Sequence, residues 1–447
     1  MNRFENFRDG GWFIRGRWLT VILSLAFVVT VGYGAAGLYF NSSYKTFFAA
    51  DNPERLAYEN IQDRFLKSDN VLFVLTAPDG DIYRPEFLQA VHWLTERAWG
   101  LHRATRVDSV TNFQHVVADG DDLLVADLVD TGATLTPELQ REIRRVAESD
   151  PLLLGRLTRL GGNTTGVHVT LKLDDSVPDD ATRAGEAAHR MAEEFRAKFP
   201  DIEMRLTGDT MMSHAFAASS QADAEQIIPI MYLVIILIAW IALRSIWMTL
   251  ITVLIVVLSS VAMLGVAGFA GFYFTSVSAI APTIVLTLAV ADSVHILKTV
   301  RHLMQQGQDR LTAIRGSMTV NQKPVFLTSV TTIIGFLGLN ASAVPTYHDL
   351  GNMTAIGVAF AWAFSVITLP ALAAIMPFRV KPVQAEAAGQ ARPGIYAALS
   401  GFAAGHSGKV LMVLVVLAVG SVAMLPQMKA YDEPIKYFSE NIEFRRD

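Results

Sequence analysis

The sequence of 447 residues contains no cysteine and few charged residues. Without cysteine, the chain has no disulfide bonds, no thiolate metal ligands and no cysteine nucleophile. Charged residues make up 18% of the chain, which is below the roughly 25% of typical soluble domains. The net charge is −5 and no basic cluster occurs of the kind that follows phosphate backbones, so nucleic acid is not an expected partner.

The sequence also lacks the motifs of common soluble enzymes. It contains no G-x-S-x-G, no H-E-x-x-H and no phosphate-binding P-loop. The histidines of the polar segment 41–225 are scattered, which favours surface or strand positions over metal ligation. We therefore expect no enzyme, no metal site and no bound cofactor. The histidines considered are His102, His115 and His168.

Apolar residues are in excess and make up 51% of the chain. About 20 apolar residues cross the hydrocarbon core of a bilayer, and seven stretches of comparable length occur. The first is longer than the apolar region of a signal peptide and lacks an A-x-A cleavage site, so we interpret it as a retained anchor. The seven predicted spans are Trp18–Phe40, Ile227–Leu243, Trp247–Gly268, Phe274–Leu297, Val325–Ser342, Ala355–Met376 and Val410–Leu425.

The distribution of lysine and arginine predicts how these spans are oriented. Short loops rich in Lys and Arg lie on the cytoplasmic side of a membrane. The loops 270–273 and 344–352 contain neither residue, whereas the alternate loops contain several. The N-terminus is therefore expected in the cytoplasm and the segment 41–225 outside. The cytoplasmic residues would be Arg3, Arg8, Arg15, Arg17, Arg244, Lys298, Arg301, Arg310, Arg315, Lys323, Arg379 and Lys381.

The predicted outside segment is acidic and alternates strand and helix patterns. Residues 41–225 contain 31 Asp and Glu against 19 Lys and Arg. The order strand–helix–strand, twice, predicts a split ferredoxin-like α+β domain, with an inserted helix at Pro137–Glu148. The expected fold class is an α-helical polytopic membrane protein with this inserted domain. The strands are predicted at Asn70–Ala77, Arg106–Phe113, Thr164–Leu173 and Ile202–Leu206, and the helices at Pro85–Trp99 and Asp179–Lys198.

Two short segments that follow equivalent spans resemble each other. Tyr44–Arg55 and Ile435–Arg445 both place a lysine, aromatics, an acid beside Asn, and Glu in the same order. This similarity predicts an internal repeat, in which a second outside domain begins at 427 and the chain is the N-terminal part of a longer protein. The expected organisation is a cytoplasmic N-terminus at 1–17, a first span at 18–40, an outside domain at 41–225, five spans at 226–376, a linker at 377–409 with a short interfacial helix at Ile395–Ala404, a seventh span at 410–426 and the domain start at 427–447.

Asp292 is the residue that indicates a function. It lies near the middle of an otherwise apolar span, where an ionised carboxylate costs roughly 3 kcal/mol on insertion scales. His295 follows at i+3 and is expected on the same helix face, where the two side chains could exchange a proton; Ser293 points elsewhere. The alternatives are an Asp that stays neutral or caps a helix break, and an interfacial His295 beside Lys298.

The fifth predicted span carries a stripe of small and hydroxyl residues. Such stripes let membrane helices approach closely and offer hydrogen bonds across the interface. The stripe is therefore expected to pack on the helix of Asp292 and to supply hydrogen-bond partners, with packing alone as the alternative. Proline is also expected to interrupt three spans, at Pro229, Pro282 and Pro370. The stripe consists of Thr328, Thr331, Thr332, Gly335, Gly338 and Ser342.

Two motifs give the sequence a family resemblance. Ala289-Val-Ala-Asp-Ser-Val-His-Ile296 resembles the fourth-span motif of resistance-nodulation-division (RND) transporters, which contains their proton-relay aspartate. Pro324-Val-Phe-Leu-Thr-Ser-Val-Thr-Thr-Ile-Ile-Gly-Phe336 is similar to the fifth-span signature of the MMPL-like branch and of sterol-sensing domains. The succession of one anchor, an outside domain, five spans and a second anchor is similar to the half-repeat of those transporters, over nearly the whole chain.

The resemblance implies proton-coupled export of a lipid or other amphiphile in a bacterial inner membrane, driven by the proton-motive force. Asp292 and His295 would form the relay, with Ser293, Thr328, Thr331 and Thr332 around them. Several relatives have Asp or Tyr where this chain has Ser293, and the relay partners of the family's tenth span are absent. The partner would then be a missing C-terminal half or a second copy, and an oligomer stays open. The alternatives are a non-pumping sterol- or lipid-sensing regulator and a half-size transporter that acts as a dimer.

Overall fold

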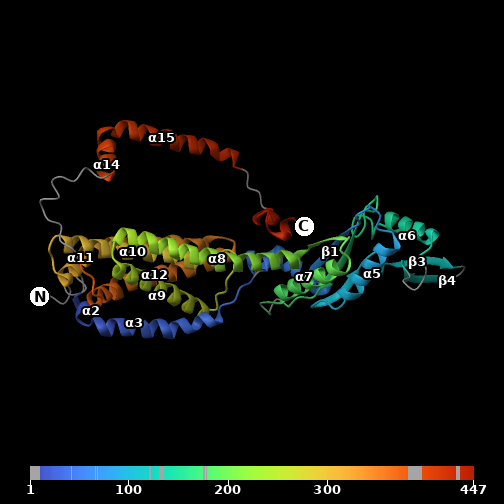
Figure 1. The fold of residues 1–447 in the computed structure, drawn as a ribbon, viewed down its shortest axis with the longest axis horizontal. Coiled ribbons are helices and arrows are strands. Elements are labelled where there is room, and N and C mark those ends of the chain that lie inside the picture. The colour runs from blue at the N-terminus through green and yellow to red at the C-terminus, as the bar shows by residue number, and fades with distance from the viewer. Residues whose placement is uncertain are drawn as a thin grey trace.

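The computed structural model has two parts, a bundle of long helices and an α/β domain at one end of it (Figure 1). Seven helices are long and apolar enough to cross a membrane, as the sequence predicts. The structure describes residues 11–41, 43–65, 67, 69–119, 122–129, 135–174, 177, 179–380, 395–428 and 433–446. The predicted N-terminal Arg3 and Arg8, and residues 381–394 of the predicted linker 377–409, lie outside these ranges.

The α/β domain contains a four-stranded antiparallel sheet in the order β2-β5-β1-β6. Alternate residues of β1, among them Val71 and Phe73, are fully buried because two helices cover that face of the sheet. The intervening residues are only partly buried, so the other face is open. The strands are β1 (Asn70–Thr76), β2 (Ala104–Asp108), β5 (Thr164–Leu171) and β6 (Glu203–Thr207), and the covering helices are α5 (Pro85–Ala98) and α7 (Asp180–Lys198).

The domain differs from the expectation after Asp108. The strand predicted to reach Phe113 ends there because Ser109, Thr111 and Asn112 form a hydrogen-bonded turn, in which the Ser109 amide donates to Asn112 Oδ1 at 2.7 Å. An unpredicted hairpin follows, formed by β3 (Gln114–Asp119) and β4 (Asp122–Asp127). All residues of β4 are exposed, so the burial alternation that reveals strands is missing from its sequence. The inserted helix is α6 (Pro137–Ser149).

The bundle helices are longer than their apolar runs. α8 is one continuous helix that leaves the α/β domain and enters the bundle, and α11 begins well before its predicted span. Pro229 and Pro370 lie inside helices, but Pro282 lies in the first turn of α10 and interrupts nothing. The helices are α2 (Gly11–Arg15), α3 (Arg17–Gly32), α8 (Asp209–Leu243), α9 (Ile246–Phe269), α10 (Ala281–Gln305), α11 (Arg310–Leu337), α12 (Pro345–Ile375), α14 (Ile395–Gly405) and α15 (Ser407–Met424).

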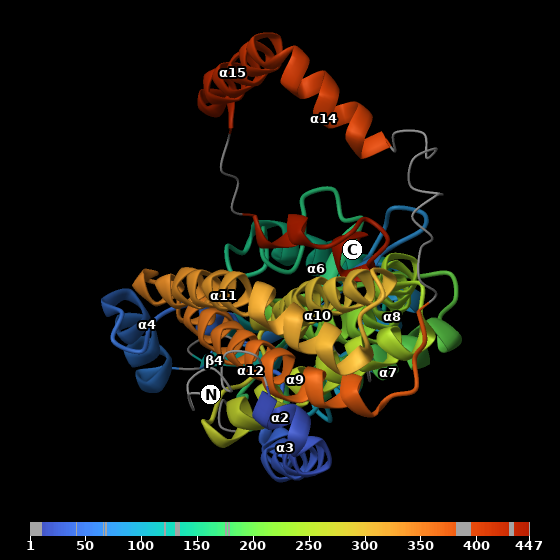
Figure 2. The ribbon, with the colours of Figure 1, turned by 90° about the vertical axis from the view of Figure 1, so that its left-hand side faces the viewer.

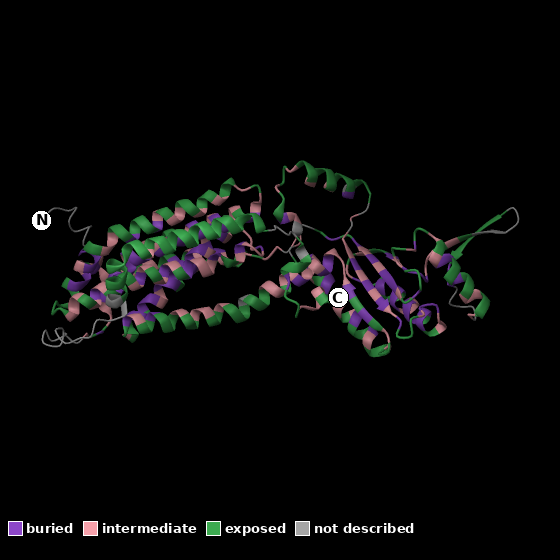
Figure 3. Ribbon diagram, turned by 90° about the horizontal axis from the view of Figure 1, so that it is seen from above, coloured by how far each residue is buried: buried purple, intermediate pink, exposed green. Residues whose placement is uncertain are grey.

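Helices α9 and α12 form the centre of the bundle and carry most of its buried residues. Helices α3, α8 and α11 pack around them, whereas α14 and α15 lie apart from the bundle (Figure 2). No residue of α15 is buried. Figure 3 shows the buried residues gathered in the sheet and on the inner faces of the bundle. The single chain therefore leaves much apolar helix surface uncovered.

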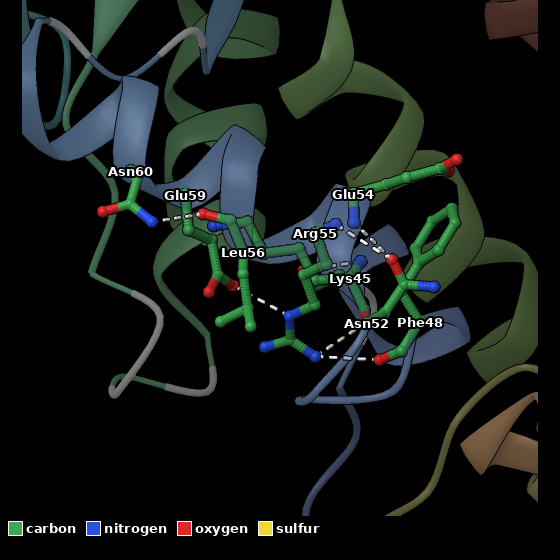
Figure 4. Close-up of polar contacts among 9 residues, drawn as sticks. Lys45, Phe48, Asn52, Glu54, Arg55, Leu56, Glu59 and Asn60 are labelled. Carbon is green, nitrogen blue, oxygen red and sulfur yellow. Dashed lines mark hydrogen bonds and ion pairs between the residues drawn. The ribbon is translucent and has the colours of Figure 1, made fainter.

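The short segment after α3 has a counterpart in the segment 433–446. In each, a four-residue 3-10 turn is followed by a phenylalanine with an extended backbone, a turn and a helix. The 3-10 turn and the helix are η2 (Tyr44–Phe47) and α4 (Pro53–Arg64) in the first segment, and η6 (Pro434–Tyr437) and α16 (Glu443–Arg446) in the second. An arginine seven residues after the phenylalanine donates to its carbonyl: Arg55 to Phe48 at 2.9 Å (Figure 4), and Arg445 to Phe438. The similarity in sequence thus extends to local structure.

Glycines bring α3 and α9 into backbone contact at the bundle end nearest the α/β domain. A Cβ on Gly265 would overlap the Val31 carbonyl oxygen, and one on Gly268 would overlap the Gly34 carbonyl oxygen. Small residues permit such close approach between membrane helices. The position of α3 against the bundle therefore depends on the absence of side chains here.

We predict that Gly265→Val destabilises the chain by about 1–3 kcal/mol, because overpacking forces the two backbones apart. The measurement is thermal unfolding of the detergent-solubilised chain. Gly335→Val is the matched control, since nothing lies within 4 Å of the position of its Cβ. Equal melting temperatures for the two variants would contradict the proposed contact.

A buried carboxylate fixes the start of α7 in the α/β domain. Asp180 is 2% exposed and accepts hydrogen bonds from the Asp174 amide at 2.9 Å and from Arg103 Nε at 3.1 Å, with His102 Nε2 at 2.6 Å. Arg103 has a left-handed backbone (φ 64°), which is uncommon outside glycine. Burial alone raises the pKa of Asp180, but the hydrogen bonds from Asp174 and His102 and the charge of Arg103 outweigh it, so this pKa lies below its ordinary value of 3.8.

We predict that Asp180→Asn lowers the free energy of unfolding by about 2 kcal/mol at neutral pH, because it removes the charge of a buried hydrogen-bond acceptor. Since the folded pKa lies below the unfolded pKa, the contribution is complete above 3.8 and is lost as the pH falls through the folded value. In thermal unfolding from neutral to acidic pH, the difference in stability between the wild type and Asp180→Asn should be constant at first. It should then disappear as the pH falls through the pKa of Asp180 in the folded protein. Asp179→Asn, at the exposed neighbouring position, should show no such gap.

Candidate functional site

Asp292 lies on α10 near the middle of the bundle. It follows the first residue of the helix, Ala281, by eleven positions, which corresponds to about 17 Å at 1.5 Å per residue. A bilayer core is about 30 Å thick, so this depth is close to the midplane of a membrane that the helix crosses. The helix breaks at its start, around residues 278–280, and not at Asp292, so this Asp does not cap a helix break.

The side chain of Asp292 is partly buried between α10 and α11. The hydroxyl of Ser329 on α11 lies near its carboxyl group, and Ser329 is itself only 4% exposed. In the part of the chain that the structure describes, Asp292 forms no ion pair. Its environment is therefore a neutral hydroxyl and apolar side chains, without a cation to offset an ionised carboxylate.

Ser293 and His295 lie on either side of Asp292 around the helix. Ser293 is fully buried, and its hydroxyl has no hydrogen-bond partner among the described residues. His295 is exposed on the surface of the single chain, in a stripe with Ala291 and Lys298. No hydrogen bond between described atoms joins His295 to Asp292. The structure therefore places the predicted relay pair on neighbouring faces of α10 without a hydrogen bond between them.

The predicted threonines of α11 bond to their own helix. Thr328 donates to the Val325 carbonyl at 3.0 Å, Thr331 to Leu327 at 2.9 Å and Thr332 to Thr328 at 2.7 Å. Thr328 and Thr331 are exposed, and Thr332 is partly buried. None of the three contacts Asp292 through a hydrogen bond between described residues, and the contact to Asp292 comes from Ser329 instead.

Ser329 is a site residue that the sequence patterns did not indicate. It follows Val325 by four positions and shares its buried helix face, since both side chains are 4% exposed. The continuous stripe of hydroxyl residues is conspicuous in the sequence. The residue beside Asp292, however, is a single buried serine outside this stripe. The signal that could have identified Ser329 is a hydroxyl residue spaced i+4 from an apolar position of this span.

Comparison with known proteins places this architecture in a family. The model of the MMPL family matches residues 104–403, which is more than half of the chain. The chain belongs to the MMPL family. A membrane protein of Methanocaldococcus jannaschii is 26% identical over 101 residues. That match spans 23% of the present chain and 26% of the relative, so it covers only about a quarter of the length of that protein.

Membership of the MMPL family confirms the resemblance to RND-type membrane proteins and assigns the chain to a family of membrane transporters rather than enzymes. The matched region contains Asp292, Ser329 and all five spans from α8 to α12. Among the described residues no group of three or more His, Asp or Glu is placed to hold a metal ion.

We predict that Ser329→Ala changes the carboxyl vibration of Asp292 in this MMPL-family chain. Loss of the hydroxyl beside the carboxyl group should move the C=O stretch to higher frequency, because hydrogen bonding weakens the C=O bond. The band is identified by infrared difference between the wild type and Asp292→Asn. Thr331→Ala is the control, as its hydroxyl bonds to Leu327, and a band that moves equally in both variants would refute the contact.

Proposed function

We propose that the protein exports a lipid or other amphiphile across or out of a membrane in exchange for protons, with Asp292 as the proton-carrying residue. The observation that carries this proposal is the mid-bundle carboxylate, which lies beside the Ser329 hydroxyl and has no ion pair among the described residues. Ionisable residues in such positions are costly, and they generally mark ion or proton pathways. The proton-motive force would supply the energy, with no further cofactor.

A proton is the species that can relieve the cost of this charge. With no cation from the described residues beside it, the Asp292 carboxylate is neutralised by protonation and becomes costly again on proton release. The Ser329 hydroxyl can donate to the carboxylate or accept from the carboxylic acid, so the contact survives both states. The unpartnered hydroxyl of Ser293 offers a further group that can accept or donate when α10 shifts.

Helix α8 supports coupling between the bundle and the α/β domain. One residue, Gly208, separates β6 from α8. Its φ is 119°, and a Cβ at this position would overlap Asn70, so a residue with a side chain does not fit here. Farther along, Tyr232 and Ile235 of α8 pack with Leu286 of α10. A tilt of the sheet is thereby transmitted along α8 to the helix that carries Asp292.

The exposed stripe beside Asp292 supports a second membrane unit as the partner, either a C-terminal half or a second copy. His295 on α10 and Thr331 on α11 are uncovered in the single chain, and lipid contact beside a carboxylate is unfavourable. The repeated local structure at Phe48–Arg55 and Phe438–Arg445 supports a duplicated architecture. His295 would then act as a relay residue together with groups of the partner.

The proposal also includes the orientation of the chain in the membrane and the fold of the α/β domain. Arg301 and Arg310 bond to the carbonyls that end α8 and α12 at the bundle end opposite the α/β domain, which supports a cytoplasmic position for that end. The α/β domain would then be periplasmic and the membrane a bacterial inner membrane. The strand order β2-β5-β1-β6 with both helices on one face supports a split ferredoxin-like domain.

We predict that Asp292→Asn abolishes proton-driven export, because an amide cannot carry a transferable proton. The measurement is movement of a fluorescent phospholipid in proteoliposomes with an imposed pH gradient, together with proton flux reported by a lumenal dye. His295→Gln should lower the rate about a hundredfold or more, in the range of a lost proton-transfer group.

Asp309→Asn is the matched control, since this exposed carboxylate caps α11 through the amides of Leu311 and Thr312, and an amide oxygen keeps that cap. It should export at the rate of the wild type. Wild-type export by a folded Asp292→Asn variant would refute proton coupling at this residue. Wild-type chain that binds lipid but moves neither lipid nor protons would favour a sensing role.

A further inference from the structure

The open face of the four-stranded sheet forms the floor of a cavity of about 620 Å³. This volume lies within the usual range of small-molecule sites, roughly 300–1,000 Å³. Leu72 of β1 and His168 of β5 are paired in register on the floor, and the segment after α6 forms a wall. The cavity is separate from the bundle and from Asp292.

The cavity concentrates positive charge in an acidic part of the chain. Lys67, Arg106 and Arg156 line it, against the single carboxylate of Asp108. Arg106 is bound to Asp108 through two contacts of 2.8 and 2.9 Å. Arg156 is exposed and forms no ion pair with a described carboxylate. Residues 41–225 as a whole carry 31 acidic and 19 basic residues, so three cations against one carboxylate around a cavity are a local exception.

Apolar side chains complete the lining beside these cations. Leu72, Phe113, Leu152 and Leu157 contribute to the walls, and Leu152 is 59% exposed. Burial lowers the pKa of His168, with Arg106 and Arg156 acting in the same direction and Asp108 opposing them. His168 is therefore uncharged at neutral pH and serves as a hydrogen-bonding group. The cavity thus has a cationic and hydrogen-bonding part and an apolar part.

We propose that this cavity binds the exported amphiphile and selects one with an anionic head, a carboxylate or a phosphate. Arg156 binds the head, and the leucines Leu152 and Leu157 contact the apolar chain. Charge-assisted hydrogen bonds from arginine to carboxylate or phosphate are stronger than neutral ones and directional. The inference rests on the proposed function, since it names the head group of the molecule that is moved and the place where it is held.

The test measures binding to the full chain in a neutral detergent at mildly alkaline pH, without a pH gradient. The probes are cis-parinaric acid, a fluorescent fatty acid that is ionised there, and its methyl ester, which has the same chain without the charge. The acid should bind at least about tenfold more tightly than the ester, as expected for a charged hydrogen bond. Equal affinities would overturn the proposal.

Substitutions assign the two parts of the cavity. Arg156→Gln should weaken binding of the acid to the level of the ester and leave ester binding unchanged. Leu152→Ser should weaken both probes. Arg159→Gln is the matched control, an exposed arginine three residues along the same segment that does not line the cavity. An equal loss in Arg159→Gln and Arg156→Gln would show a general charge effect and would overturn the site.

Two further measurements distinguish an amphiphile site from a plain anion site, and lipid binding from proton coupling. Millimolar inorganic phosphate should not displace the fatty acid, and full displacement would show an anion site without amphiphile selectivity, which would overturn the proposal. Asp292→Asn should bind both probes as the wild type does. If Asp292→Asn still exports at the wild-type rate while binding depends on Arg156, proton coupling is refuted and the cavity stands. If export requires Asp292 but binding does not depend on Arg156, the cavity is refuted and proton coupling stands.

Discussion

A carboxylate at the middle of a membrane bundle must be hydrogen-bonded, protonated or covered by another chain, because an exposed charge there is costly. The Ser329 hydroxyl beside Asp292 is the group that can supply the first of these, and in the proposed function the proton and a partner supply the other two. The central helices α9 and α12 are apolar and well buried, so they stabilise the bundle without any ionic contact to Asp292. The stability of the bundle and the state of its carboxylate are in this way separate, and protonation can change without loss of packing.

The long helices and most of the sheet follow from patterns that the sequence shows directly. Apolar runs predict the spans, and period-two alternation predicts β1 and β5 because one face of each is buried. The starts of α8 and α11 do not follow, since Asp209 and Arg310 begin polar helical turns that no hydropathy pattern marks. Hydropathy reports the solvent around a helix, whereas the helix itself ends where its backbone hydrogen bonds end.

The sequence alone singles out Asp292 as a candidate residue but does not give its contacts. Asp292 is conspicuous because no other acidic residue interrupts its span. Its partner depends on the rotation of α11 about its own axis, and a turn of one residue, about 100°, exchanges Ser329 for Thr328. Hydroxyl residues lie on more than one side of α11, so the sequence does not determine which side of this helix faces α10. The same limit applies to His295, whose separation from Asp292 around α10 decides whether the two side chains meet.

The connections from the α/β domain to α3 and to α8 differ in stiffness. This difference indicates through which of them a movement of the domain reaches the bundle. The path from α3 runs through the 3-10 turn η1 (Tyr33–Gly37), the bridge of Phe40 to Phe274, the turn that Arg55 closes and the short helix α4 before β1 begins at Asn70. The path into α8 is one glycine followed by 35 helical residues. Short connections transmit displacement and long irregular ones absorb it. A ligand that tilts the sheet from its open face would therefore act on α10 through α8, while α3, held to α9 by its glycines, stays in place.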